Sequence, residues 1–348
     1  MATPNAGNSV LVDGQTKFNE RMLGAEWRLP ESAAIKAANL SEIANPALRE
    51  IRTSASRTST AKFPIRQTAT GGTVRVASHT GDNPATDTET ISWNKFVEDF
   101  SISLTLADNN VYEWMELYAA AKRNAIYNLI SRVDASLISS LLSDKSTTSA
   151  GGANGNFEGT TTDDYQIGQG FSNNFFGEVK AMMMKNTYGG PYVGIVDAGG
   201  AVLKDTLGRD GAGNASNTAA QLLGFSQIVP TSRTVLSTGT YDASGIFYQN
   251  GLVAVNFWIP PKNRKTINAD KAMMDSVGDF GQFTVPEFPG ITFAHSIYAG
   301  RSDQSSAGGD EQDVLIHEEV SLEMAYVSAP VSAFQTEDSP VFTAGLLT

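Results

Sequence analysis

The sequence has 348 residues, a formal net charge of −12 and no cysteine. The length predicts two domains, or one domain with large excursions. The missing cysteines exclude disulfides, cysteine–zinc sites and thiol catalysis. The acidic charge weighs against a dedicated nucleic-acid binder, because phosphate neutralisation supplies most non-specific affinity. No apolar run is long enough for a membrane anchor, and the first residues show neither the basic nor the apolar part of a secretory signal.

Residues 1–58 are predicted to form an arm with little core of its own. Large apolar side chains are sparse there, with a short helix plausible near residues 31–38, so the segment cannot offset its own ordering entropy. We therefore expect a neighbouring subunit to hold it. The arm is mildly basic and the remainder strongly acidic, which suits docking between copies. The candidate inter-subunit contacts are three basic residues and two apolar anchors: Arg49, Arg52, Arg57, Phe63 and Ile65.

Residues 59–105 are predicted to form an extended β-hairpin. Alternating residues at 61–69 and 73–78 flank Gly71 and Gly72, and the polar stretch 79–89 is expected to be a loop. A second alternating run, 90–106, predicts a strand that leads directly into a helix.

The longest helical pattern covers residues 108–144. Apolar side chains recur there at spacings of three and four, and no Pro or Gly interrupts them. From Tyr112 to Ser143 the helix would be about 48 Å long, at 1.5 Å per residue. Asp108 and its two neighbours are suitable capping residues.

The rest of the chain alternates between short strands, short helices and polar loops. We expect a loop at 150–164 and helices at 175–186 and 201–207, the second followed by a polar loop at 209–218. Strands are expected at 192–196, 228–230, 245–249, 252–258, 283–298 and 314–326, and a tail at 336–348.

Residues suited to catalysis are scarce. The three histidines, His79, His295 and His317, lie in separate segments. His317-Glu318 begins like a zinc-protease motif, but the second ligand position holds Ser321. Phosphate-loop and nucleophile-elbow motifs are absent, and the glycines at 208–214 do not complete a dinucleotide fingerprint. We therefore predict no enzyme activity and no catalytic, cofactor or metal site.

The order of these segments resembles the Hong Kong 97-type major capsid protein of tailed bacteriophages, a fold shared with encapsulins. Residues 91–106 resemble the strand that closes the extended loop, and Tyr112–Ser143 resembles the spine helix. GANGNFEG at 152–159 resembles the following glycine turn. The stretch 192–205 resembles the start of the axial domain, and LLGFSQIVPTSR at 222–233 its next strand, with the proline displaced to Pro230. Residues 314–326 resemble the last peripheral strand.

The resemblance implies an α+β Hong Kong 97-like capsid fold with five parts. They are an N-terminal arm (1–58), an extended loop (59–105), a peripheral domain with the spine helix (106–171 and 283–335), an axial α/β domain (172–282) and a C-terminal tail (336–348). It also implies a virion protein that forms hexamers and pentamers around double-stranded DNA and is assembled in the host bacterial cytoplasm. Its implied partners are a portal, decoration proteins and a scaffolding protein, which we expect in trans because the arm starts close to Met1.

Two other functions remain open from the sequence. One is an encapsulin-like shell that packages a cargo enzyme, and the other is a β-rich hydrolase or carbohydrate-binding protein.

Deletion of residues 1–50 is expected to abolish regular shells, because it removes most of the arm. Negative-stain microscopy of the expressed chain checks this. Normal particles from the deleted chain would refute the role of the arm.

Overall fold

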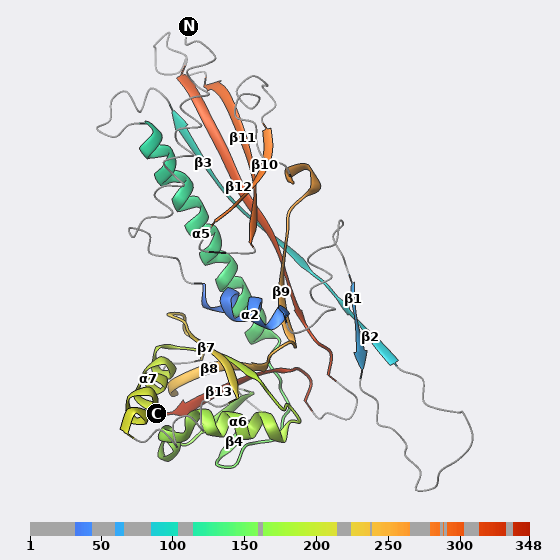
Figure 1. Ribbon diagram of the computed structural model, residues 1–348, viewed down its shortest axis with the longest axis vertical. Helices are drawn as coiled ribbons and strands as arrows, with labels where there is room; N and C mark the ends of the chain where they lie inside the picture. The colour runs from blue at the N-terminus through green and yellow to red at the C-terminus, as the bar shows by residue number, and fades with distance from the viewer. Residues whose placement is uncertain are drawn as a thin grey trace, which may run out of the picture. The chain divides into compact units, whose positions relative to one another are not determined.

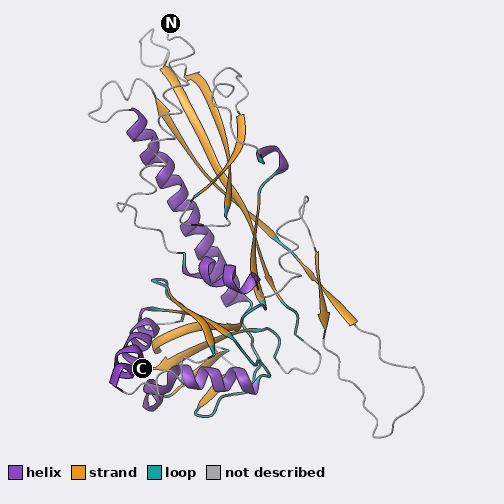
Figure 2. Cartoon of the chain, viewed as in Figure 1, coloured by secondary structure: helices purple, strands orange, loops and turns teal. Residues whose placement is uncertain are grey.

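The computed structural model describes residues 32–43, 60–65, 85–103, 114–158, 163–213, 224–236, 239–264, 279–285, 288, 291–302, 313–331 and 337–348. It is a mixed α+β chain with two larger sheets and a two-stranded ribbon, which confirms the predicted class (Figures 1 and 2). The predicted contacts Arg49, Arg52 and Arg57 lie outside the described residues.

The chain divides into two compact units. Over the described residues, unit 1 comprises Trp93–Val133 and Phe257–Met324, and unit 2 comprises the ranges 31–92, 134–256 and 325–348. The division falls within the long helix α5 (Trp114–Ser143), which therefore contributes residues to both units. The expected boundary at 171/172 lies inside unit 2, and the one at 282/283 lies inside unit 1.

Unit 1 is built on long antiparallel strands. The strands β10 (Asp279–Thr284), β11 (Thr292–Ser302), β12 (Asp313–Ser328) and β3 (Trp93–Ser103) follow one another in that order, and β9 (Val253–Trp258) also pairs with β12. A single strand over 283–298 was expected here. The structure instead forms the hairpin β10–β11, because Pro286, Pro289 and Gly290 interrupt the run, and proline cannot donate to a strand ladder.

Unit 2 holds a six-stranded mixed sheet. Its order is β4 (Gly155–Glu158), β5 (Asp164–Ile167), β13 (Val341–Leu347), β8 (Tyr241–Gln249), β6 (Tyr192–Val196) and β7 (Phe225–Pro230). The 3-10 turn η1 (Gln169–Asn174) leads into α6 (Phe175–Lys185), and α7 (Ala198–Gly213) follows β6. Side chains of α6 and the sheet share one hydrophobic core, against which Leu203 and Leu207 of α7 pack.

Two predictions for unit 2 are corrected. The expected tail contains β13, which lies between β5 and β8, and its residues Val341–Leu346 are buried. Their apolar run, interrupted only by Thr343, is typical of a strand covered on both faces. The helix expected at 201–207 extends over Ala198–Gly213, including part of the predicted polar loop.

The predicted arm contains the helix α2 (Ala33–Ile43), which packs against β6 and β7 of its own chain. Figure 1 shows α2 above these strands and α6 below them. Ala34, Ile35, Ala37 and Ala38 are buried. For this part of the arm, the expectation that a neighbouring subunit holds it is wrong. A deletion that ends at residue 31 therefore tests the part of the arm before α2 without removing α2.

For the predicted hairpin, the structure forms a two-stranded ribbon, but with another partner strand than the expected one at 73–78, which lies outside the described residues. Strand β1 (Thr60–Ile65) pairs antiparallel with β2 (Ala85–Thr90), so that Thr60 faces Thr90 and Ile65 faces Ala85. Residues 85–89 were expected to be loop, but alternating threonines suit a half-exposed strand. The turn expected at Gly71-Gly72 lies outside the described residues.

We predict that Ile130→Ala in α5 destabilises the protein by about 2–5 kcal/mol, because this fully buried side chain would leave a cavity. Denaturant unfolding followed by circular dichroism measures the change. Tyr127→Ala on the same helix, where the side chain is 42% exposed, is the control and should change stability far less. Equal losses for both variants would contradict the placement of α5.

Candidate assembly surface

The sheet of unit 1 has one face packed against α5. Phe100 of β3 lies edge-to-face with Tyr118 of α5 at 5.8 Å between ring centroids. Farther along, the guanidinium of Arg132 pairs with Glu98 and donates to the carbonyl of Val97 at 3.0 Å. Alternation along the strands therefore directs Glu98 and Phe100 toward the helix, whereas Lys95 and Ser101 are exposed. Helix α5 fixes the sheet on one side and leaves the other side open.

A charged cluster is buried between α5 and this sheet. Lys122 of α5 is 2% exposed, and its ammonium lies 2.8 Å from Oε1 of the fully buried Glu318 on β12. The imidazole of His295 on β11 also contacts Oε1, at 2.9 Å, and the Tyr118 hydroxyl donates to Oε2. The Lys122 ammonium also lies 4.7 Å from the centroid of the Phe283 ring. One carboxylate thus joins the helix to two strands.

Burial would by itself raise the pKa of Glu318, but the Lys122 ammonium and the His295 hydrogen bond lower it from 4.5 to about 2. A carboxyl whose pKa is lower in the folded than in the unfolded protein stabilises the fold at pH values above its unfolded pKa. That contribution is lost as the pH falls from about 4.5 toward 2. At neutral pH the cluster therefore favours the packed arrangement of α5 on the sheet.

The open face of the sheet carries polar side chains. The Oγ of Ser101 on β3 lies 2.8 Å from Nδ1 of His317 on β12. The Nζ of Lys95 lies 3.9 Å from Oε1 of Glu319. This alternation is typical of an antiparallel sheet with one solvated face. The Lys95–Glu319 pair is exposed and so contributes little to stability.

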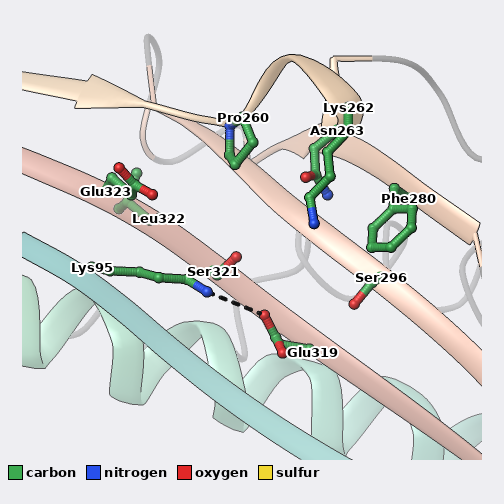
Figure 3. A pocket seen from close by; sticks show the side chains of 10 residues that line it. All are labelled: Lys95, Pro260, Lys262, Asn263, Phe280, Ser296, Glu319, Ser321, Leu322 and Glu323. Carbon is green, nitrogen blue, oxygen red and sulfur yellow. Dashed lines mark ion pairs between the residues drawn. The ribbon is translucent and has the colours of Figure 1, made fainter. Parts of the chain in front are cut away.

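A pocket of about 80 Å³ lies on this face, beside the turn η2 (Pro261–Asn263) that follows β9 (Figure 3). Lys262 lies with its ammonium 4.4 Å from the centroid of the Phe280 ring, while Asn263 donates to the carbonyl of His295 at 3.1 Å. The space is about the size of one side chain, far below the roughly 300–1,000 Å³ usual for small-molecule sites. The lining residues are Lys95, Pro260, Lys262, Asn263, Phe280, Ser296, Glu319, Ser321, Leu322 and Glu323.

The β1–β2 ribbon contains the two predicted apolar anchors. Phe63 is 3% exposed within its own chain, and Ile65 ends β1 opposite Ala85. On β2, Asp87 is exposed. Burial and the nearby carboxylates of Asp87 and Asp144 raise the pKa of Glu89. The structure therefore brings Phe63 and Ile65 onto one strand, and it gives the opposite strand an acidic character.

Sequence reasoning missed the buried charges. The sequence patterns did not single out Lys122 or Asp134, and Glu318 was considered only as part of an incomplete zinc-protease motif. The detectable signal was their position: Lys122 and Asp134 occur within the apolar periodicity of the helix, and Glu318 alternates with the buried face of β12. Charges there need internal partners.

Within the described residues, no group of three or more His, Cys, Asp or Glu side chains is placed to hold a metal ion. No described helix is both long enough and apolar enough to cross a membrane.

No protein-family model matches the sequence, and a comparison with curated proteins gives no match. Solved structures are similar in fold at low identity. A chain from Mycobacterium phage Che8 is 12% identical with a TM-score of 0.46, covering 92% of this chain and 93% of that one. The capsid structure of the cyanophage P-SCSP1u is 14% identical with a TM-score of 0.43, covering 85% of each chain. The capsid of Ralstonia phage GP4 is 10% identical with a TM-score of 0.43, covering 85% and 84%.

We predict that Glu318→Gln lowers the free energy of unfolding by about 3–5 kcal/mol, because it removes the carboxylate that lies 2.8 Å from the buried Lys122 ammonium. The double variant Lys122→Met/Glu318→Gln should recover most of the loss. The wild type should lose stability between pH 4.5 and about 2 more steeply than the double variant. Denaturant titrations at several pH values measure both effects, and equal stability of Glu318→Gln and wild type would contradict them.

Proposed function

We propose that this chain is the major structural subunit of a tailed-phage shell with the Hong Kong 97-like arrangement, and that its role is assembly rather than catalysis. The observation that carries the proposal is the β1–β2 ribbon. Among the described strands, β1 and β2 pair only with each other and join neither larger sheet. A two-stranded ribbon is at best marginally stable by itself. Further contacts from another copy of the chain would stabilise it.

The order of elements supports the same proposal. The ribbon is followed by β3 and then by the 30-residue helix α5, and the long strands β11 and β12 return late in the chain to pair beside β3. This is the order expected of an extended loop, a spine helix and a peripheral sheet. The buried Glu318 cluster holds α5 against its sheet, and the polar side chains on the other face of that sheet are available for weak contacts. The closed symmetry of the assembly then determines the form of the particle.

The finer parts of the proposal concern the assembled particle. Hexamers and pentamers of this chain would enclose double-stranded DNA, which the acidic subunit contacts without sequence preference. A scaffolding protein in trans, a portal and decoration proteins are the proposed partners. The virion is the proposed location, after assembly in the bacterial cytoplasm. Arg49, Arg52 and Arg57 remain proposed contacts between copies, together with Phe63 and Ile65.

An encapsulin-like shell is the second candidate, because the same fold would serve it. The contents of purified particles distinguish the two: DNA supports the phage shell, and a packaged enzyme supports the encapsulin. A β-rich hydrolase or carbohydrate-binding protein would instead be a monomer that turns over or binds a member of a substrate panel.

We predict that the chain, expressed with its neighbouring genes, elutes in the void volume of a sizing column as capsomers, tubes or closed shells. Negative-stain microscopy identifies them. Deletion of residues 1–31, which leaves α2 in place, should reduce regular shells while the circular dichroism spectrum stays like that of the wild type. If the deleted chain assembles as well as the wild type, the arm before α2 is not needed for assembly.

A further inference from the structure

Asp134 is a second buried charge on α5, and all its partners lie within unit 2. The residue is 0% exposed. Its Oδ1 accepts from the backbone amides of Ala34 at 3.0 Å and Ile35 at 3.4 Å. Its Oδ2 accepts from Nε of Arg233 at 3.1 Å. One carboxylate thus connects α5, the segment after β7 and the first turn of α2.

The two amides are those that a capping side chain normally satisfies. The first N–H groups of a helix have no partner inside it, and the residue just before the helix usually supplies an oxygen. Here that residue is Ser32, which is buried, but its hydroxyl has no hydrogen-bond partner among the described residues. Asp134, 100 positions along the chain from Ala34, accepts these bonds instead. The beginning of α2 therefore depends on α5 rather than on its own sequence.

The first turns of α2 are closely packed. Among residues 33–38, whose side chains are described, the buried ones are alanines apart from Ile35. Small side chains allow close approach to β6 and β7 but bury little apolar area each. The directional bonds to Asp134 are what define where the helix begins.

We propose that Asp134 is the positioning residue of the N-terminal segment, because it holds the first turn of α2 at one fixed place in unit 2. The inference rests on the proposed function, in which that segment contacts neighbouring copies. Every copy of a symmetric shell must present the segment from an equivalent place. Asp134 sets that place from inside its own chain.

The variant Asp134→Asn distinguishes the positioning role of this side chain from the effect of its charge. Burial raises the pKa of Asp134, so the ionised carboxylate favours folding less than a neutral acceptor would at neutral pH. An asparagine side chain would keep an oxygen for the two amides, and it would lose both the charge and the acceptor that face Nε of Arg233. Asp134→Asn should therefore retain the position of α2, whereas Asp134→Ala should lose it.

The test measures hydrogen exchange of peptides covering residues 32–43, together with particle formation, in the full-length chain. We expect Asp134→Ala to speed exchange in α2 by at least about fivefold, as loss of a helix cap does, and to give few or irregular shells. Asp134→Asn should resemble the wild type in both measurements. Asp144→Asn is the matched control, because it alters the carboxylate just after the same helix, which accepts from the Tyr326 hydroxyl at 2.6 Å and not from α2.

Unchanged exchange in Asp134→Ala would overturn the inference, as would faster exchange with normal shells. If Asp134→Ala fails to fold, the double variant Ser32→Asp/Asp134→Ala decides. If the aspartate at position 32 restores folding, protection from hydrogen exchange and shell formation, the inference is supported. If the double variant stays unfolded, the inference is overturned. A wild-type chain that never assembles would refute the proposed function instead, while the exchange measurement would still decide whether Asp134 holds α2.

Discussion

Helix α5 carries buried charges on both of its halves, and each charge must be neutralised inside the protein. Lys122 meets Glu318 in unit 1, and Asp134 meets Arg233 and the amides of α2 in unit 2. An unpaired charge at either place would cost several kcal/mol. These pairs determine which strands lie against the first half of the helix and which segment lies against the second. The helix thereby contributes to two units that have separate sheets.

This organisation fits a protein whose work is to hold its shape while its edges make contacts. In unit 1 the ionic cluster is covered by α5, and the opposite face of the sheet is polar and open. In unit 2 the core is filled by aromatic and methionine side chains, and α2 is fixed at its first turn. The β1–β2 ribbon belongs to neither large sheet. Rigid units with a separate ribbon suit assembly through many small contacts, and none of this requires a catalytic group.

The sequence predicted elements with strong local patterns and missed features that depend on distant partners. The helix α5 was predicted within two residues of its start, because its apolar spacing is regular and uninterrupted. Strand β13 was taken for a tail, because its short apolar run is buried only through pairing with β5 and β8. The cap of α2 could not be predicted at all, since Ser32 is the obvious local candidate and Asp134 acts from elsewhere in the chain. The anchor residue Phe63 was identified as apolar, but its burial within its own chain follows from tertiary packing.

The most direct test of the shell proposal is the size of the particles that the full-length chain forms when expressed with its neighbouring genes. Sedimentation velocity over a series of protein concentrations, with cryo-electron microscopy of the fastest fraction, gives that size and its symmetry. The account predicts large particles in which copies of this subunit are grouped in sixes and fives. A chain that remains monomeric at every concentration, with all of its neighbours present, would contradict it.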